Sequence, residues 1–223
     1  MPELRSVMGF MIKAVIFDLD GVLTRSDHYH AAAWHQTCKA WSIPFEDRTA
    51  DLLRGMGRLE SAGIVAEKGG VELTREQLAE FAEEKNGRYV QLLNEMTGTD
   101  VIAKVPLLLQ LLSDRGIPLA VASSSRNAAY ILEKTGLKQY FAVVIDGHQI
   151  SRSKPDPEVF RKTADALGIS CKDCLVVEDA VSGVKAALAL GAKVAAVGPA
   201  ANTPGVTYSL KETGDLMEVF REK

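Results

Sequence analysis

The chain has 223 residues, of which 47% are hydrophobic and 25% charged, a balance typical of one large globular domain or two unequal ones. Its formal net charge of −3 gives no overall basic field that would recruit nucleic acid or an anionic membrane. The three cysteines, an odd and low number, argue against a secreted disulfide framework. We therefore expect a cytoplasmic protein that binds neither nucleic acid nor membrane.

The first ten residues are expected to be an extension, because Met11 directly precedes the first apolar segment. The opening stretch MPELRSVMGFMIK lacks the apolar region of a secretory signal. No run in the chain approaches the roughly 20 apolar residues that a membrane-spanning helix needs.

The first predicted strand, Ala14–Leu19, is apolar apart from one carboxylate near its end. Its residues show no polar alternation, which is typical of a strand buried on both faces. Asp18 lies within the run and Asp20 just beyond it. A core strand that ends in two carboxylates is the first indication of a functional site.

The next segment, residues 26–96, contains no candidate for a buried strand. Tyr29–Ala40 has a helical pattern, and Thr74–Leu93 is a strong amphipathic helix whose start, Thr74 to Gln77, resembles a capping box. We interpret residues 26–96 as an all-helical insertion, with residues 1–25 and 97–223 forming one core domain.

After the insertion, short apolar strands alternate with helices. Asp156 and Pro157 are expected to open a helix that Gly168 stops, and a second helix is predicted over Ala180–Leu190. Such alternation predicts an α/β fold with a parallel sheet. The four predicted strands of this part are Leu119–Ser123, Val143–Ile145, Leu175–Glu178 and Val194–Val197.

Cys171 and Cys174 form a C-x-x-C pair just before one of these strands. A four-thiolate metal site needs a second such pair, and the chain has none. We interpret the two cysteines as ordinary thiols rather than as a redox or metal site.

Ligands of an open parallel sheet bind at the carboxyl ends of its strands. Carboxylates, hydroxyls and a lysine all come to that edge. They are Asp18 and Asp20 after the first strand, Ser123, Ser124 and Ser125 with Arg126 and Asn127 after the second, Lys154 ahead of a helix, and Glu178 with Asp179 after the fourth.

Four carboxylates at such proximity repel one another, and a divalent cation relieves the repulsion. All-oxygen ligands suit Mg²⁺. A magnesium ion beside hydroxyl and lysine donors describes a site for phosphoryl transfer. Asp18 would then be the nucleophile, and Asp20, two residues later, would carry the proton.

Each signal also has a plainer interpretation. Asp20 and Gly21 could simply form a turn. The acidic pair at Glu178 and the hydroxyls at Ser123 could simply cap the helices that follow them. Their coincidence at three strand ends favours the functional interpretation.

The motifs, taken together, resemble those of the haloacid dehalogenase superfamily across nearly the whole chain from Met11. The four matching stretches are VIFDLDGVLT, VASSS, SKPDPEVF with its lysine, and VVEDAVSGVKAA with its acidic pair. The resemblance implies a Rossmann-like core with a helical cap inserted after the first motif, which agrees with the insertion described above.

The inserted segment resembles the β-phosphoglucomutase branch of that superfamily. The resemblance implies that His30 helps to govern Asp20, that Gly55 and Arg58 belong to a cap loop gripping the phosphate that is not transferred, and that Lys85 also faces substrate. The stretches that carry it are SDHYHAAAW (26–34), LRGMGR (53–58), EEKNGRYV (83–90) and ASSSRN (122–127).

The implied activity is a magnesium-dependent mutase that interconverts β-D-glucose 1-phosphate and glucose 6-phosphate. It would proceed through an aspartyl-phosphate, with β-glucose 1,6-bisphosphate as intermediate and activator and one Mg²⁺ per chain. The implied metal site comprises Asp18, the backbone carbonyl of Asp20, Glu178 and Asp179. The implied catalytic groups are Asp18, Asp20, Ser123, Lys154 and His30, and the implied substrate-binding groups are Gly55, Arg58, Lys85, Ser123, Ser124, Arg126, Asn127 and Lys154.

Two other functions stay open: a phosphatase acting on small phosphorylated sugars, and a non-catalytic phosphosugar-binding protein on the same fold. A mutase needs a second anion site on the cap, whereas a phosphatase needs only the core site. The sequence also departs from the branch: Leu59 and Glu60 follow Arg58, and no glycine precedes the helix expected in Lys104–Leu112. These departures leave the sugar open, and the resemblance favours a monomer.

Overall fold

The computed structural model describes residues 12–221, so the extension expected at residues 1–10 lies outside the described part of the chain. One six-stranded, all-parallel sheet forms its centre, in the order β3-β2-β1-β4-β5-β6. The strands are β1 (Ala14–Phe17), β2 (Leu119–Ala122), β3 (Val143–Ile145), β4 (Cys174–Glu178), β5 (Lys193–Ala196) and β6 (Tyr208–Ser209).

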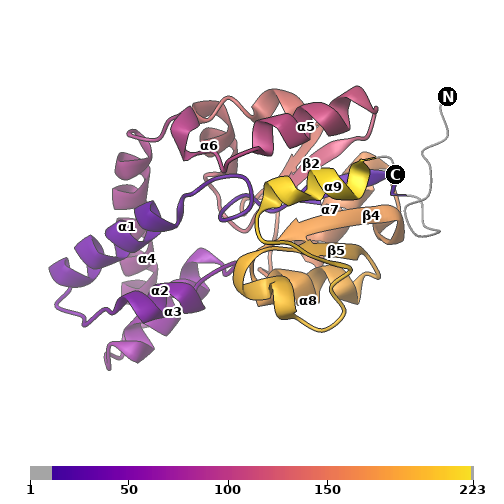
Figure 1. The fold of residues 1–223 in the computed structure, drawn as a ribbon. Coiled ribbons are helices and arrows are strands. Elements are labelled where there is room, and N and C mark those ends of the chain that lie inside the picture. The colour runs from indigo at the N-terminus through magenta and orange to yellow at the C-terminus, as the bar shows by residue number, and fades with distance from the viewer. Residues whose placement is uncertain (1–11, 222–223) are drawn as a thin grey trace.

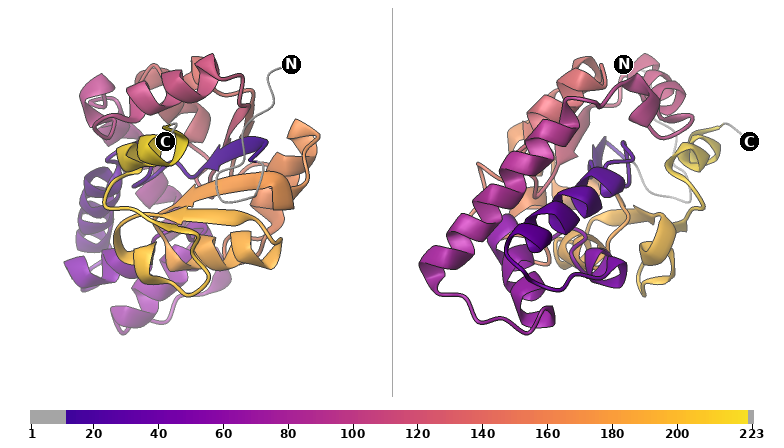
Figure 2. Two further views of the ribbon diagram at one scale, coloured as in Figure 1. Left: turned by 45° about the vertical axis from the view of Figure 1, so that its right-hand side comes forward. Right: turned by 90° about the vertical axis from the view of Figure 1, so that its left-hand side faces the viewer.

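Helices cover both faces of this sheet (Figures 1 and 2). One face packs against α5 (Val105–Asp114), α6 (Ala128–Lys134) and α9 (Leu216–Phe220), and the other against α7 (Glu158–Leu167) and α8 (Val181–Ala189). Short 3₁₀ helices complete the connections: η1 (Gly98–Asp100), η2 (Lys138–Tyr140), η3 (Cys171–Asp173), η4 (Gly198–Asn202) and η5 (Thr213–Asp215).

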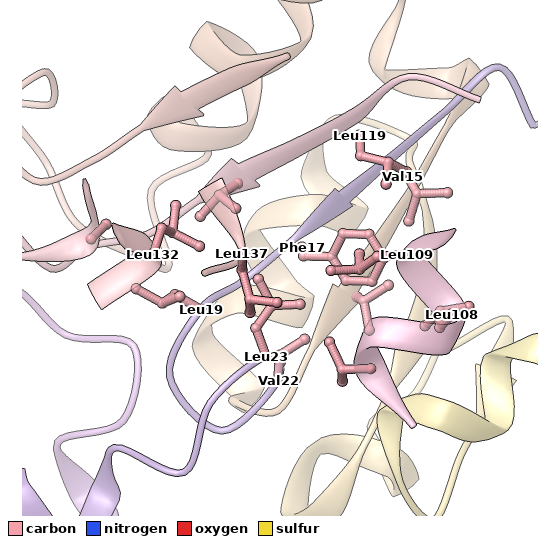
Figure 3. Packing of buried hydrophobic residues seen from close by; sticks show 14 of the residues in the cluster. Val15, Phe17, Leu19, Val22, Leu23, Leu108, Leu109, Leu119, Leu132 and Leu137 are labelled. Carbon is pink, nitrogen blue, oxygen red and sulfur yellow. The ribbon is translucent and has the colours of Figure 1, made fainter. Parts of the chain in front are cut away.

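The alternation of side chains along β1 explains why its sequence is apolar throughout. Val15 and Phe17 belong to the hydrophobic cluster under α5, which Figure 3 shows, and Ala14 and Ile16 belong to the cluster under α7 and α8. All four are at most 1% exposed. Since successive residues of a strand face opposite sides, a strand covered on both faces has no polar positions.

Four helices occupy the segment between β1 and α5: α1 (Asp27–Ala40), α2 (Asp47–Leu52), α3 (Arg58–Lys68) and α4 (Arg75–Leu93). They lie together at one side of the molecule, beyond the end of the sheet (Figure 1). They enclose a hydrophobic cluster of their own, which includes Trp34, Val65 and Phe81. The described part of this segment has no strand, as the sequence predicts.

The two chain segments that join this helical group to the sheet lie side by side. Thr24 pairs with Val101 in an antiparallel bridge. The N–H of Arg25 donates to the carbonyl of Asp100 at 2.8 Å, and the N–H of Ile102 donates to the carbonyl of Leu23 at 3.0 Å. The chain thus enters and leaves the helical group through two segments that pair with each other.

Several local predictions can be compared with the structure. The capping box between Thr74 and Gln77 is present in both directions, and Gly168 ends α7 in the left-handed conformation. The start of α7 is shifted, because Pro157 is the N-cap and the Asp156 carboxylate accepts the N–H of Glu158 at 3.0 Å. Strand β6, of two residues, is an element that the sequence did not predict.

Lys104 shows what replaces the glycine missing before α5. Its φ of 64° is in the left-handed region, where a side chain is strained. Its ammonium contacts Glu212 at 2.6 Å and lies 3.8 Å from Asp215. The lysine at this left-handed position thus forms ion pairs with the C-terminal part of the core.

No helix in residues 12–221 is long and apolar enough to cross a membrane.

Candidate active site

The carboxyl ends of β1, β2 and β4 bring a buried lysine and two carboxylates together. The Lys154 ammonium is fully buried and donates to Asp18 Oδ1 at 2.5 Å, to Glu178 Oε2 at 2.9 Å and to the carbonyl of Ala122 at 3.2 Å. Charge-assisted bonds of this kind hold each group in a single arrangement. Three segments far apart in the sequence are thereby fixed around one ammonium.

Burial dominates the electrostatics of this group. It raises the pKa of Asp18, although the Lys154 ammonium opposes the shift, and it raises the pKa of Glu178 to about 7. Burial also raises the pKa of Asp179 well above its usual value, reinforced by the neighbouring charges of Glu178 and Asp18. Burial alone would lower the pKa of Lys154, but the two carboxylates outweigh it and the pKa is raised. The cluster is therefore short of positive charge.

Asp18, Glu178 and Asp179 form the cluster that fits a divalent cation. One carboxylate oxygen of each lies within 4.8 Å of the others, and all three residues are buried. Hard oxygen donors crowded in this way suit Mg²⁺. Gly21, with φ of 80°, lets the backbone approach so closely that a Cβ there would stand 2.2 Å from Asp179 Oδ2. The residues present therefore fit the magnesium ion that the sequence predicts.

Asp20 is held from the helical side of the cleft. The Ser26 hydroxyl donates to Asp20 Oδ1, and His30 Nε2 lies 4.0 Å from the same oxygen. Burial, with the nearby Asp18 charge, raises the pKa of Asp20 to about 7. His30 Nδ1 lies 2.7 Å from the Lys85 ammonium, whose pKa burial lowers to about 7. Burial likewise lowers the pKa of His30, with Lys85 adding to the shift.

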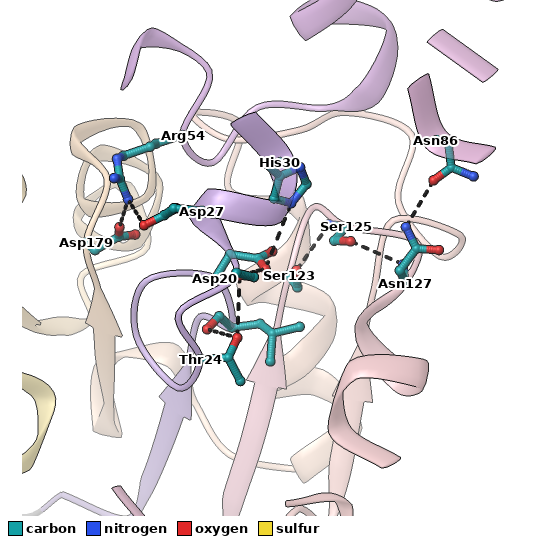
Figure 4. A network of polar contacts seen from close by, with 12 residues as sticks. Asp20, Thr24, Asp27, His30, Arg54, Asn86, Ser123, Ser125, Asn127 and Asp179 are labelled. Carbon is teal, nitrogen blue, oxygen red and sulfur yellow. Dashed lines mark hydrogen bonds and ion pairs between the residues drawn. The ribbon is translucent and has the colours of Figure 1, made fainter. Parts of the chain in front are cut away.

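The loop after β2 lines the cleft and is held by hydrogen bonds between its own hydroxyls and backbone N–H groups. The Ser123 hydroxyl accepts the N–H of Ser125 at 3.1 Å, and the Ser125 hydroxyl accepts the N–H of Asn127 at 3.2 Å. The Asn127 amide donates to Asn86 on α4 at 3.0 Å (Figure 4). Ser123 itself is 1% exposed. The loop is thus rigid at its start and reaches the helical group at its end.

The loop between α2 and α3 closes the cleft from the opposite side. Ser124 donates its hydroxyl proton to the carbonyl of Gly55 at 3.0 Å. Gly55 has φ of 75°, and a Cβ there would lie 2.7 Å from the Ser182 hydroxyl and 3.2 Å from Ala180. Arg58, at the start of α3, contacts Glu83 at 2.5 Å. A glycine is therefore required where the two halves of the cleft touch.

All of these groups surround one cleft of about 1320 Å³. Lys154 and Glu178 lie beneath its floor, fully buried. The other residues that the sequence indicated line it: Asp18, Asp20, His30, Gly55, Arg58, Lys85, Ser123, Ser124, Arg126, Asn127 and Asp179. The structure thus brings together every residue of the predicted site, while their individual roles stay predictions.

The sequence interpretation missed three residues that contact the predicted site: Ser26, Asp27 and Arg54. Ser26 bonds to Asp20, and Arg54 contacts both Asp27 and Asp179 (Figure 4). Ser26 and Asp27 stand just after the first motif, and Arg54 stands inside the stretch LRGMGR. Their position in these stretches was the available signal, but their partners depend on tertiary contacts.

The cysteines lie away from this cleft and are unpaired: Cys38, Cys171 and Cys174 are all free thiols. Burial raises the pKa of Cys174 to about 12 and that of Cys38 to about 11. Such thiols carry little thiolate at neutral pH and are poor nucleophiles.

A parallel α/β core with a buried Asp–Lys–Glu group at its strand ends, and a helical group facing it, defines the haloacid dehalogenase class. The family model of haloacid dehalogenase-like hydrolases matches residues 12–191. The chain belongs to this family and is an enzyme of the haloacid dehalogenase superfamily.

Particular relatives include enzymes of two activities. The chain is 34% identical to β-phosphoglucomutase of Bacillus subtilis (strain 168), over 95% of either chain. A crystal structure of β-phosphoglucomutase (pgmB) from Clostridium difficile matches it with a TM-score of 0.88 at 30% identity, covering 94% of this chain and 97% of that one. A phosphorylated carbohydrates phosphatase of Thermotoga maritima is 29% identical, covering 93% of this chain and 91% of its own.

Proposed function

We propose that this chain is a magnesium-dependent β-phosphoglucomutase, which interconverts β-D-glucose 1-phosphate and glucose 6-phosphate. Residues 26–96 serve as its cap domain, and residues 1–25 and 97–223 as its catalytic core. The likeness to β-phosphoglucomutases over nearly the full chain supports this proposal.

Asp18 is the nucleophile in this proposal. One of its carboxylate oxygens attacks a phosphorus of β-glucose 1,6-bisphosphate, and the bond from that phosphorus to the sugar oxygen breaks. Asp20 gives its proton to the departing sugar oxygen. The sugar monophosphate leaves, and the reverse sequence on the other monophosphate regenerates the bisphosphate, with Asp20 taking the hydroxyl proton.

The core residues supply fixed charge for this transfer. Lys154 holds Asp18 in one orientation, and Ser123 offers a hydroxyl to the transferring phosphoryl group. Asp18, Glu178 and Asp179 would hold Mg²⁺ with their carboxylates, and the backbone carbonyl of Asp20 would be a further ligand. When bound, the ion neutralises negative charge on the transferring phosphoryl group.

The helical cap determines whether the aspartyl-phosphate reacts with a sugar hydroxyl or with water. His30, with Lys85 behind it, orients Asp20 from the cap. Ser124, Arg126 and Asn127 flank the sugar on the core side. Contacts such as that between Ser124 and Gly55 keep the cap closed, which excludes water until a sugar hydroxyl arrives.

The observation that carries the proposal is an arginine of the cap, Arg58, in the same cleft as Asp18. Arg58, a planar and permanently charged fork, lines this cleft from the cap. A bisphosphate that reacts in either of two orientations requires such a group, whereas hydrolysis of a monophosphate does not.

The test supplies β-glucose 1-phosphate, a trace of β-glucose 1,6-bisphosphate and Mg²⁺, and then measures glucose 6-phosphate and inorganic phosphate in the same sample. We expect glucose 6-phosphate in large excess and no turnover without Mg²⁺. Dominant release of phosphate would reject the mutase in favour of the sugar phosphatase, an activity that the relative from Thermotoga maritima carries. Neither product, with no aspartyl-phosphate analogue formed with Mg²⁺ and fluoride, would favour a phosphosugar-binding protein.

A further inference from the structure

Arg54 makes a contact between the cap and the metal-binding carboxylates that the proposed reaction does not use. Its Nη1 donates to Asp179 Oδ2 at 2.9 Å and to Asp27 Oδ2 at 2.8 Å. Figure 4 shows the guanidinium between the two carboxylates, one from the first turn of α1 and one from the core. Asp179 is almost fully buried at 7% side-chain exposure, and Arg54 is 27% exposed.

Arg54 is the cap residue that forms an ion pair with Asp179. The backbone at Gly21 presses against Asp179 Oδ2 from one side, and the Arg54 guanidinium approaches from the other. The Lys154 ammonium forms ion pairs with Asp18 and Glu178 instead. The three metal-binding carboxylates therefore contact two cations, Lys154 from the core and Arg54 from the cap, and Arg54 also pairs with Asp27.

Arg54 lies beside Asp179 at the boundary of two cavities. A second cavity, of about 290 Å³, lies beside the main cleft and is lined partly by Arg25, Gly198 and Lys211. Asp27, Arg54 and Asp179 line both cavities. A cation that comes to Asp179 from either cavity meets Arg54.

Resting on the metal site of the proposed function, we propose that Arg54 is a positioning residue that couples closure of the cap to occupancy of that site. In the closed form it occupies Asp179 and competes with the divalent cation. A divalent cation at Asp179 repels the guanidinium that bonds to the same carboxylate, so Arg54 is released from Asp179 and keeps its bond to Asp27. The phosphates of a substrate then supply the negative charge that closes the cap over the loaded site.

This coupling is reciprocal, because two ligands that affect each other through one equilibrium do so by the same factor. Metal binding therefore favours the open cap in the enzyme without sugar, and removal of Arg54 strengthens metal binding. Asp27 gives the released guanidinium a second partner, so Arg54 need not enter solvent unpaired.

The test is calorimetric titration of Mg²⁺ into the full chain without sugar. We expect Arg54→Leu to bind Mg²⁺ about fivefold tighter or more than the wild type, within the range usual for such couplings. Arg54→Lys, which keeps the charge, should stay close to the wild type. Arg58→Leu is the matched control: it removes a cap arginine of similar exposure whose partner, Glu83, belongs to the cap, and it should change Mg²⁺ affinity less than twofold.

Small-angle scattering without Mg²⁺ gives a second readout. The wild type should be more compact than Arg54→Leu, and added Mg²⁺ should reduce the difference. Unchanged or weaker Mg²⁺ affinity in Arg54→Leu, or a shift of equal size in Arg58→Leu, would overturn the inference. Mg²⁺ binding without mutase turnover would reject the proposed function alone, and mutase turnover with unchanged Mg²⁺ affinity in Arg54→Leu would reject only this coupling.

Discussion

The core side and the cap side of the cleft hold their charged groups in different ways. On the core side, Lys154 is fully buried and bonded to two carboxylates, which stand at the ends of β1 and β4. On the cap side, Arg58 is 21% exposed and its partner Glu83 is 68% exposed, on helices joined to the core by one narrow connection. A rigid, dry group suits bond-making chemistry, and an exposed, exchangeable ion pair suits recognition of a phosphate that comes and goes.

The largest expected effect is on the core side, at Asp18. Asp18→Asn keeps the shape of the side chain but removes the nucleophile, so we expect no measurable turnover of β-glucose 1-phosphate in the coupled assay. The fold should survive, because an amide oxygen can still accept a bond from Lys154. Full activity in this variant would remove Asp18 from its role.

Replacement of Lys154 should damage stability and rate together. Lys154→Met leaves Asp18 and Glu178 buried without their cation, which we expect to lower the free energy of unfolding by about 3–5 kcal/mol. Loss of one preorganised donor should also lower the rate by roughly 10²–10³. Urea unfolding and steady-state kinetics check both. A fully stable variant would contradict the view that the core group depends on this ammonium.

Replacement of Arg58 should lower the rate without a comparable loss of stability. We expect Arg58→Ala to lower isomerisation by about 10²-fold, because one bidentate phosphate contact is lost. The free energy of unfolding should change by less than about 1 kcal/mol, the upper value for an exposed ion pair. Kinetics with unfolding curves test this, and a variant whose stability falls as far as its rate would erase the contrast between the two sides.

These variants also mark what the sequence could predict. The sequence alone places Asp18, Ser123 and Glu178 together, because the carboxyl ends of neighbouring parallel strands share one edge of the sheet. It does not place Arg54, since the contact of this residue with Asp179 joins positions 125 apart and depends on how the helical group docks.

Secondary structure, too, was predictable only where it depends on residues close together in the sequence. The capping box at Thr74 involves only neighbours and was predicted correctly. Strand β6 has two residues, Tyr208–Ser209, too few for a periodic signal, and exists because its backbone pairs with β5. The left-handed backbone of Lys104 likewise goes against the preference of a residue with a side chain, and its partners Glu212 and Asp215 are far away in the sequence.

A smaller effect is expected at the ion pair between two cap residues, Arg58 and Glu83. Glu83 occupies the guanidinium of Arg58, and an exposed pair of this kind contributes about 0.2–1 kcal/mol. Glu83→Gln should therefore tighten the apparent binding of β-glucose 1,6-bisphosphate by roughly 1.5- to 5-fold. Glu76→Gln, in the first turn of the same helix, is the control. Weaker binding in Glu83→Gln would show that Glu83 supports Arg58 rather than competing with phosphate.

The smallest effect concerns the loop that carries Lys154. Hydrogen bonds from Lys162, Ser151 and the backbone of Arg152 lower the pKa of Glu158 from 4.5 to about 2. A carboxylate whose pKa is lowered by folding stabilises the native state above its unfolded pKa, and this contribution disappears as pH falls through the folded pKa. The wild type should be more stable than Glu158→Gln above pH 4.5, and the two should converge near pH 2.

Thermal unfolding across pH 2–7 measures this convergence. Glu133→Gln serves as the control, because Glu133 and its partner Lys138 are both more than half exposed. A difference between wild type and Glu158→Gln that persists unchanged at the lowest pH would contradict the electrostatic origin.

The most direct test of the account maps the phosphorylated residue. The enzyme is mixed with β-glucose 1,6-bisphosphate and Mg²⁺, quenched in acid within the first turnover, digested and analysed by mass spectrometry. The account predicts phosphate on Asp18 of the wild type, absent in Asp18→Asn. Phosphate on a different residue, or no phosphorylated peptide while glucose 6-phosphate still forms, would contradict it.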